Sequence, residues 1–568
     1  MSEIKKKYWL THFEKSDFEE SPDYIETLEY FQKFEQNTDA VKIITFGNTP
    51  QQRELKLVIV NHDGIFTPAD IKKSGKAVVL IQNGIHPGEI EGKDASMLLL
   101  REILISGEKK NLLDKIVLLI IPVFNADGHE RISPFNRPNQ NGPRKTGWRT
   151  NALNLNLNRD YMKADSPEMR AWLNMFNLWL PDFIIDNHTT NGADYQYHVT
   201  YGIEKHQNIH PALSKWSKNK YLPYLLRKVE NDGFLTGPYM EFKNGTPESG
   251  IIQFASLPRY STGYCALQNR ICLLVETHSL KPFRNRVYST KSVMEHSLVF
   301  INKNAGELIN LNKQADRETL LKYCSGKSKF PVRIAGKDSA GNFRFKGVEH
   351  HDEYSQVTGS EVRRYTGKPV EFEIPVYNKT EIEKSVIAPF AYSIPVEFNF
   401  LTELLAAHGI EYHRLIRPKE INVEKYKFTD VKFWQRPYEG RQLAEYNCKV
   451  FPEKVKLGEG TIIIPVKQRT FRIILNLFEP ESPDSLAAWG FFNAFFERKE
   501  YAEVYIMEPV AEKMLNEEEK IRNEFLNKLE EEDFRNNPAE RLDFFYRNSP
   551  FFDQRENVYP IFRIPGKF

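Results

Sequence analysis

The most informative stretch for the fold of this chain is Ala77-Val-Val-Leu-Ile-Gln-Asn-Gly-Ile-His-Pro-Gly-Glu89. It begins as an apolar run and leads into His86 and Glu89, at the point where a strand would end. A histidine and a carboxylate at this spacing can hold one metal ion together. Alone, the pair has an ordinary explanation too, because loop histidines are common and a carboxylate suits the start of a helix.

A second histidine makes the metal interpretation stronger. His188 ends another apolar run, Phe183-Ile-Ile-Asp-Asn-His188. A catalytic zinc ion typically takes three protein ligands, such as two His and one Glu, and keeps a fourth position open for water. The residues His86, Glu89 and His188 are a set of this kind.

Four short runs in the first half of the chain are rich in Val, Ile and Leu with little polar alternation, which is typical of strands buried on both faces. They are residues 77–85, 115–124, 182–186 and 270–275. Helical patterns separate them, at residues 89–104 and at residues 166–180, where Ser166 and Pro167 fit a helix start. This alternation predicts an α/β fold with a mostly parallel or mixed central sheet and helices on both faces.

Polar residues follow each of these runs. They are His86 with Glu89, then Asn125-Ala-Asp-Gly128, then His188, and then Glu276-Thr-His278. In open α/β sheets, ligands bind outside the carboxyl ends of the strands. We therefore expect these side chains to meet at one edge of the sheet.

Six motifs occur in the order in which they are found in zinc metallopeptidases of the carboxypeptidase A family. They are His86-Pro-Gly-Glu89, Asn125-Ala-Asp-Gly128, Trp148-Arg149, Asn156-Leu-Asn158-Arg159, Asp186-Asn-His188 and Leu274-Val-Glu276. Each motif is weak alone, but together they are specific. Over roughly residues 20–300 the chain resembles this family.

The resemblance implies a set of catalytic roles. His86, Glu89 and His188 would bind one zinc ion, Arg149 would polarise the scissile carbonyl, and Glu276 would be the general base. Amide hydrolysis needs these residue types, because zinc lowers the pKa of bound water from about 15.7 to about 7. A carboxylate must then carry the proton to the leaving amine, and fixed positive charge must stabilise the oxyanion.

The resemblance also implies substrate-binding residues. Asn158 and Arg159 would hold the terminal carboxylate of the substrate, which a planar guanidinium can bind through two hydrogen bonds. Tyr260 and Tyr264 are both candidates for the tyrosine that closes over the substrate in this family, and we assign Tyr264 to substrate binding.

Several of these residues have alternative interpretations. Arg149 and Arg159 lie in a stretch with other cations, among them Arg137 and Arg144, so they could be surface residues instead. His278 is interpreted as a structural residue.

One position departs from the family pattern. The family usually carries an acidic residue two positions before the Asn of its Asn-Arg pair, where it orients a zinc-binding histidine. Here that residue is Asn156, a neutral amide. Because such partners tune the basicity of the ligand, the strength of the metal site depends on this position.

The composition excludes several partners. Lys and Arg number 78 against 76 Asp and Glu, and a net charge of +2 gives no general attraction to nucleic acid or to a membrane surface. No apolar segment approaches the roughly 18 residues needed to span a bilayer. We expect a cytoplasmic protein if the chain is complete, and a periplasmic or secreted one if a signal peptide has been removed.

The chain of 568 residues is longer than one hydrophobic core allows, so several domains are expected. We predict a carboxypeptidase-like catalytic domain at residues 1–320 and a β-rich accessory domain at residues 321–410. Residues 411–568 would form an α+β region, partly helical, whose role the sequence does not indicate.

The leading functional hypothesis is a zinc-dependent hydrolase that removes C-terminal residues from peptides. An alternative is a zinc amidohydrolase acting on N-acyl amino acids, since these substrates also carry a carboxylate for Arg159. A third is a binding protein for peptide or cell-wall material whose catalytic site is vestigial. The sequence does not indicate the oligomeric state.

Overall fold

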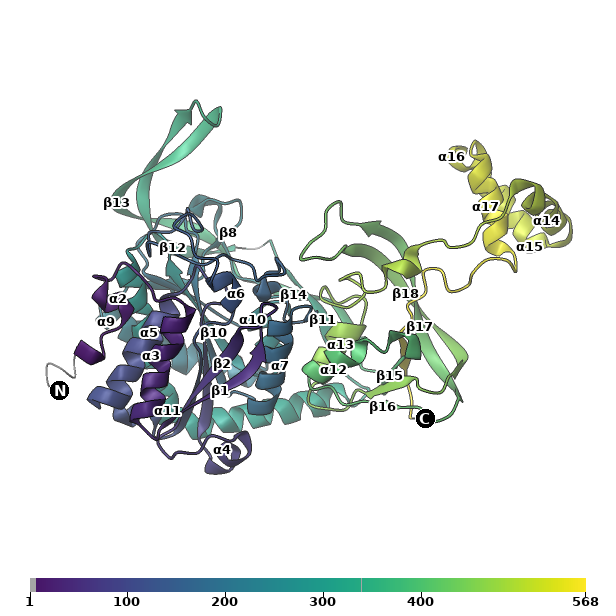
Figure 1. Cartoon of the computed structure of the whole chain (residues 1–568). Helices are drawn as coiled ribbons and strands as arrows, with labels where there is room; N and C mark the ends of the chain where they lie inside the picture. The colour runs from purple at the N-terminus through teal and green to yellow at the C-terminus, as the bar shows by residue number, and fades with distance from the viewer. Residues whose placement is uncertain (1–6, 339, 568) are drawn as a thin grey trace.

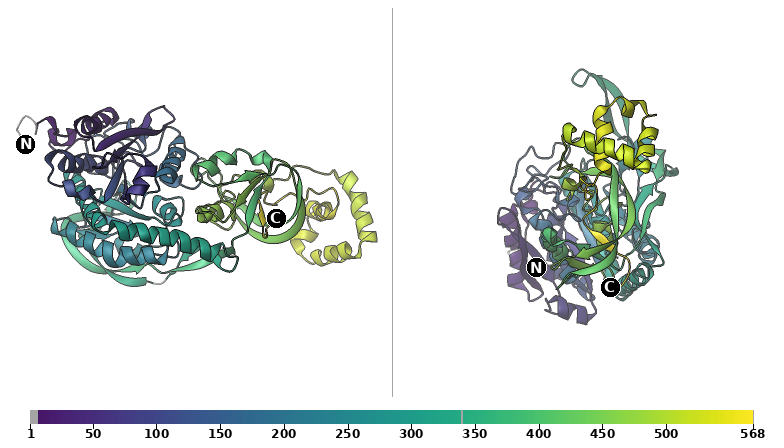
Figure 2. Two further views of the ribbon diagram at one scale, coloured as in Figure 1. Left: turned by 90° about the horizontal axis from the view of Figure 1, so that it is seen from below. Right: turned by 90° about the vertical axis from the view of Figure 1, so that its right-hand side faces the viewer.

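The computed structural model of the chain describes residues 7–338 and 340–567. Figure 1 shows a large body that contains the N-terminal half, a smaller β-rich part coloured green beside it, and a yellow helical cluster beyond that. The view from below in Figure 2 shows that the three parts follow one another along one axis.

The body is built on an eight-stranded sheet of order β1-β2-β4-β3-β5-β10-β6-β7. Its strands are β1 (Val41–Asn48), β2 (Glu54–Val60), β3 (Ala77–Gln82), β4 (Ile116–Ile121), β5 (Phe183–Thr190), β6 (Val199–Ile203), β7 (Thr236–Pro238) and β10 (Ile271–His278). The central strands β4, β3, β5 and β10 are parallel, whereas β1 and β2 pair antiparallel, as do β2 with β4 and β6 with β10. The predicted mixed sheet is confirmed, and its four predicted strands form the centre.

Helices cover both faces of this sheet, as predicted. Consecutive side chains of a strand point to opposite sides, so each side chain shows what packs on its own face. In β3, Leu80 belongs to the core cluster that includes residues of α7 (Pro167–Trp179). Its neighbour Ile81 belongs to the cluster that includes residues of α5 (Glu91–Arg101) and α11 (Phe283–Tyr323). The sheet therefore lies between two apolar layers.

Two β-ribbons are attached to the body. In one, β11 (Lys329–Gly336) pairs with β14 (Thr380–Ile387). In the other, β12 (Ala340–Ser355) pairs with β13 (Ser360–Tyr377), and this hairpin projects from the top of the body in Figure 1. Its base is joined to the body where β13 pairs with β9 (Ile251–Ile252).

The β-rich part is a six-stranded sheet of order β16-β19-β15-β20-β17-β18. Its strands are β15 (Ala391–Ile394), β16 (His413–Arg414), β17 (Lys419–Phe433), β18 (Ala444–Leu457), β19 (Ile462–Pro465) and β20 (Phe562–Ile564). β20, from near the end of the chain, pairs with β15 and β17, so distant segments close one sheet. The domain boundaries at residues 320 and 410 stay predictions.

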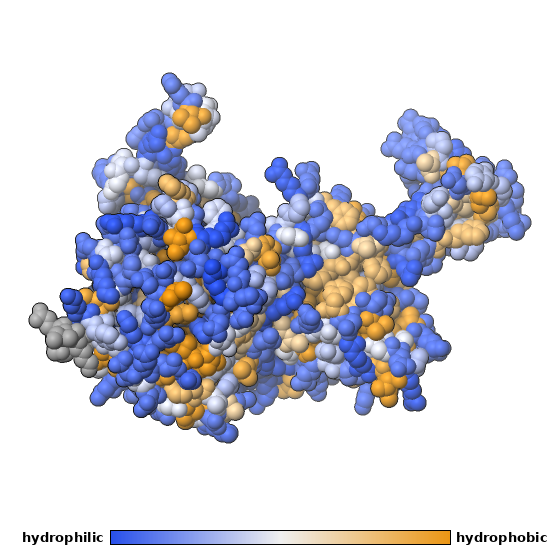
Figure 3. Space-filling model, in the orientation of Figure 1, coloured by the Kyte–Doolittle hydropathy of each residue, from blue (hydrophilic) through white to orange (hydrophobic). Residues whose placement is uncertain are grey.

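The helical cluster contains α14 (Val504–Glu517), α15 (Glu519–Lys528), α16 (Glu532–Arg535) and α17 (Pro538–Asn548), packed around their own small core. Figure 3 shows a largely hydrophilic face of the molecule, with hydrophobic residues gathered over the β-rich part. Within residues 7–338 and 340–567, no helix combines the length and the apolar character needed to cross a bilayer.

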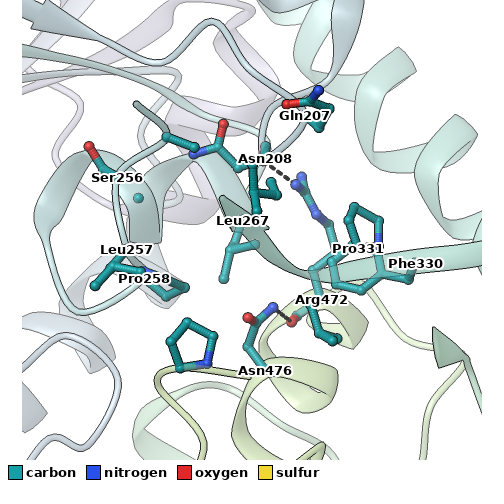
Figure 4. A pocket seen from close by; sticks show the side chains of 15 residues that line it. Gln207, Asn208, Ser256, Leu257, Pro258, Leu267, Phe330, Pro331, Arg472 and Asn476 are labelled. Carbon is teal, nitrogen blue, oxygen red and sulfur yellow. Dashed lines mark hydrogen bonds between the residues drawn. The ribbon is translucent and has the colours of Figure 1, made fainter. Parts of the chain in front are cut away.

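Arg472, in α13 (Phe471–Phe478), fastens the β-rich part to the body. Its buried guanidinium donates to the Ala266 carbonyl at 2.8 Å, to Asn269 Oδ1 at 2.7 Å and to the Asn208 carbonyl. Figure 4 shows the small pocket beside this contact, with a volume of about 30 Å³, which Arg472 and Asn208 help to line. Because a buried charge is stable only when it is well hydrogen-bonded, this contact fixes how the two parts sit together.

Candidate active site

The predicted polar residues gather at the carboxyl edge of the central strands. His86 and Glu89 lie in the segment between β3 and α5. His188 in β5 and Glu276 in β10 are register partners on neighbouring parallel strands. This is the edge at which ligands bind in open α/β sheets.

Three of these residues form a potential metal site. His86 Nδ1 lies 3.1 Å and His188 Nδ1 lies 3.0 Å from the same oxygen, Glu89 Oε2. One ligand atom from each residue lies within 4.8 Å of the other two, and all three residues are buried. Two His and one Glu with converging ligand atoms are the donor set of a catalytic zinc site.

The outer nitrogen of each histidine is held by another side chain. His86 Nε2 lies 3.0 Å from Asn156 Oδ1, and His188 Nε2 lies 3.0 Å from Asp186 Oδ2. With these nitrogens as donors, both Nδ1 atoms keep a lone pair directed toward Glu89. Metal-binding histidines are oriented in this way, so the residues fit a bound metal ion.

The neutral Asn156 therefore occupies the place that an acidic residue has in related sites. We predict that Asn156→Ala lowers zinc affinity by about 10- to 100-fold, because the outer partner of His86 is lost. Asn156→Asp should retain or increase the affinity. Zinc affinity measured by competition with a chelator checks both variants, and equal affinity in Asn156→Ala and the wild type would show that Asn156 does not orient His86.

The second carboxylate oxygen of Glu89 is bound by two arginines. Arg137 Nη1 and Arg149 Nη1 each lie 3.1 Å from Glu89 Oε1. Burial acts to raise the pKa of Glu89, but the nearby His86, Arg137 and His188 lower it well below its usual range. Arg149 is 39% exposed and Arg137 only 11%, so Arg149 has more freedom to reach a substrate.

Glu276 is a buried carboxyl beside the potential metal ligands. Burial, the largest cause, raises its pKa to about 8, while the charge of His188 acts against this and that of Glu89 adds to it. A general base works best when its pKa lies near the operating pH. The environment of Glu276 therefore suits proton transfer.

Asn158 and Arg159 lie in the short turn Leu157–Arg159. Asn156 caps this turn, because its Oδ1 accepts the Asn158 N–H at 3.0 Å as well as bonding to His86. The Arg159 guanidinium lies 4.6 Å from the centre of the Tyr260 ring, and its Nη1 donates to the Asn158 carbonyl at 2.8 Å. One turn thus connects the potential metal site to a cation.

Residues 27–227 match the family of zinc carboxypeptidases. Over this part of its length the chain is similar to zinc carboxypeptidases. This match and the curated carboxypeptidases that the chain resembles indicate a metallocarboxypeptidase, and therefore a hydrolase. The matched residues contain all three potential metal ligands.

Curated relatives agree with this assignment. The chain is similar to carboxypeptidase 2 of Trichophyton rubrum, with 22% identity over 433 residues, covering 73% of this chain and 74% of the relative. Carboxypeptidase 2 of Trichophyton tonsurans matches to the same extent, at 22% identity over 73% of this chain and 74% of its own.

Among solved structures, carboxypeptidase A from Helicoverpa armigera has a TM-score of 0.36 at 16% identity, covering 52% of this chain and 73% of that one. The metallo-carboxypeptidase from Burkholderia cenocepacia has a TM-score of 0.37 at 16% identity, covering 49% of this chain and 69% of that one.

The structure does not support Tyr264 as a substrate-binding residue. Tyr264 is fully buried, and its hydroxyl is bonded to His408 Nδ1 at 3.0 Å and to Gln268 Nε2 at 3.0 Å. The cause is α10 (Ser261–Leu267), which begins directly after Tyr260 and turns Tyr264 into the core. Tyr260, in contrast, lies against Arg159.

Three further residues near the site were not predicted. Arg137, considered only as a surface cation, bonds Glu89 instead. The charge of Glu276 is the largest cause that raises the pKa of Tyr239, so this phenol lies close to the general-base candidate. Tyr438, from the β-rich part, accepts a hydrogen bond from Arg159. None of the three lies in a motif that marks it in the sequence.

Proposed function

We propose that this protein is a zinc-dependent exopeptidase that removes C-terminal residues from peptides, with one zinc ion held by His86, Glu89 and His188. The observation that most supports the proposal is the turn 156–159. Asn156 orients a potential metal ligand, and Arg159, at the other end of the turn, presents a guanidinium. A guanidinium at a fixed place relative to a metal site suits a substrate that ends in a carboxylate.

The chemistry then divides among the side chains described. When bound, zinc would supply the Lewis acidity that makes water a nucleophile near neutral pH. Glu276 takes the proton of the attacking water and returns it to the leaving amine. Arg149 places positive charge where the scissile carbonyl oxygen becomes negative. Arg159, with Asn158 beside it, holds the terminal carboxylate and so aligns the last peptide bond with these groups.

Substrate comparison with the wild-type protein tests this proposal. A peptide with a free C-terminal carboxylate should be cleaved at least about tenfold more efficiently than its C-terminal amide, because hydrogen bonds to a charged group contribute about 1.5–3 kcal/mol. Free C-terminal amino acids should appear as the products. Equal cleavage of the acid and the amide would contradict the exopeptidase proposal.

The amidohydrolase alternative is tested in the same assay. N-acyl amino acids carry the carboxylate that Arg159 would bind, so this residue does not distinguish the two activities. An N-blocked dipeptide and an N-acyl amino acid compared at equal concentration do distinguish them. We expect faster cleavage of the dipeptide, and the reverse order would favour the amidohydrolase.

The role of Arg159 gives a more specific prediction. Arg159→Lys keeps the positive charge but loses the planar guanidinium, which can donate two parallel hydrogen bonds to a carboxylate. We therefore expect kcat/KM for the peptide acid to fall by about 10- to 100-fold. The matched control is Arg170→Lys, at a surface arginine paired with the exposed Glu403. If both variants cleave the peptide acid as the wild type does, Arg159 does not bind the terminal carboxylate.

A further inference from the structure

A turn of the β-rich part reaches the turn that carries Arg159. Residues 438–441 form the tip region between β17 and β18, where Tyr438 and Arg441 exchange backbone hydrogen bonds of 2.8 and 3.0 Å. The two residues between them, Glu439 and Gly440, have φ of 50° and 77°. Positive φ at both central residues is typical of tight two-residue hairpin turns. The turn is therefore a compact support for its side chains.

All three side chains of this turn, which also contains Gly440, bind the body. The Tyr438 hydroxyl accepts a hydrogen bond from Arg159 Nε at 3.1 Å. Glu439 Oε2 accepts the backbone N–H of Asn156 at 2.8 Å. Arg441 pairs with both carboxylate oxygens of Asp165. The hairpin turn thus holds both ends of the segment that connects the metal site to Arg159.

Tyr438 packs on a buried residue, Trp489, which is linked to the body through Asp484. The Tyr438 ring stacks on Trp489, with centroids 5.9 Å apart and planes inclined by 15°. The Trp489 Nε1–H donates to Asp484 Oδ1 at 3.1 Å, and Asp484 accepts from the side chain of Arg259 at 2.7 Å. Arg259 precedes Tyr260, whose ring lies against the Arg159 guanidinium. Tyr438 and Tyr260 are therefore linked through one network.

The contacts of Arg159 leave a defined part of its guanidinium for a ligand. Tyr438 occupies the Nε–H and the Asn158 carbonyl occupies one N–H of Nη1. Within residues 7–338 and 340–567, no acceptor binds Nη2. One N–H of Nη1 and both of Nη2 are therefore left for a ligand, and a guanidinium can bind a carboxylate through a fork of two parallel hydrogen bonds.

We propose that the turn 438–441 completes the terminal-carboxylate subsite, with Tyr438 as a positioning residue that directs the Arg159 fork toward the substrate. This inference rests on the proposed exopeptidase function. It makes the β-rich part a component of the active site, because the residue that orients the carboxylate-binding arginine comes from its hairpin.

The first test is Tyr438→Phe in the full chain. The ring and its stacking on Trp489 are retained, and only the hydrogen bond to Arg159 is lost. KM for the peptide acid should rise by about tenfold, the factor expected for one hydrogen bond to a charged group, while kcat and zinc content stay unchanged. The acid-to-amide ratio of kcat/KM should fall by the same factor. A merely structural tyrosine would leave this ratio unchanged.

The matched control is Tyr446→Phe on β18 of the same hairpin. Its hydroxyl donates to the Pro480 carbonyl at 3.0 Å and does not bind Arg159. This variant should keep the wild-type KM and the wild-type acid-to-amide ratio. A Tyr438→Phe protein that behaves like Tyr446→Phe would overturn the proposal.

A double-mutant cycle with Arg159→Lys supplies a second test. If Tyr438 acts through the Arg159 fork, Tyr438→Phe should have little further effect in the Arg159→Lys background, so the two losses are not additive. Additive losses would overturn the proposal. If the wild-type protein cleaves the peptide acid and the peptide amide equally well, the exopeptidase function itself is refuted. If the wild type prefers the peptide acid and Tyr438→Phe keeps the same preference, only the role of the turn is refuted.

Discussion

Glu276→Gln should lower kcat for a peptide substrate by roughly 10²- to 10⁴-fold, the contribution of a positioned acid–base group. Glutamine keeps the size of the side chain and most of its hydrogen-bonding capacity but cannot take the proton of the attacking water. Zinc content and KM should remain close to those of the wild type, because Glu276 is not among the three residues with converging ligand atoms. Parallel measurement of kcat, KM and bound zinc checks this expectation.

Glu204→Gln is the matched control for removing a buried carboxyl. Burial raises the pKa of Glu204 as well, but its carboxylate accepts from Asn208 Nδ2 at 2.6 Å and from the Ser256 N–H at 3.1 Å, not from a site residue. The control should keep its kcat. Near-normal turnover in Glu276→Gln would make Glu276 structural, and loss of zinc from that variant would make it a ligand.

His188→Ala should lose its zinc and, with it, its hydrolytic activity. Two ligands, His86 and Glu89, would remain, which is too few for a stable catalytic site. The buried carboxylate of Asp186 also loses its 3.0 Å contact with the imidazole, so some thermal stability should be lost too. Metal analysis after dialysis, together with a peptide assay, measures the effect.

The control for this variant is His278→Ala. His278 is also buried, at the end of β10 next to β5, but its Nε2 is bonded to Asp194 Oδ1 at 3.1 Å rather than directed at Glu89. It should retain zinc. Full zinc occupancy and activity in His188→Ala would remove His188 from the metal site.

The centre of the fold could be predicted because its signals are local. β3 and its parallel neighbours are buried on both faces, so each appears as a continuous apolar run. α7 begins as expected, with Ser166 Oγ accepting the Met169 N–H at 3.2 Å and Pro167 in the first turn. The potential metal ligands could be found for the same reason, since His188 lies in β5 and His86 and Glu89 lie in the short segment after β3.

The periphery of the site could not be predicted, because long-range contacts build it. Tyr438 reaches Arg159 across 279 residues of sequence, and only the folded β-rich part brings the two together. Arg137 lies in an irregular segment, where no periodicity reports burial. The choice between Tyr260 and Tyr264 depended on the start of α10, which leaves the first at the site and turns the second into the core.

The most direct measurement of the central claim is a zinc titration of the metal-stripped protein, with release of the C-terminal residue from a peptide acid as the readout. The stripped protein should be inactive, and activity should rise in proportion to added zinc and level off at about one equivalent per chain, because one set of His86, Glu89 and His188 is present. Full hydrolysis by the stripped protein would contradict the account. Binding of one zinc ion without any hydrolysis would contradict it equally, and would show a binding protein with a vestigial site.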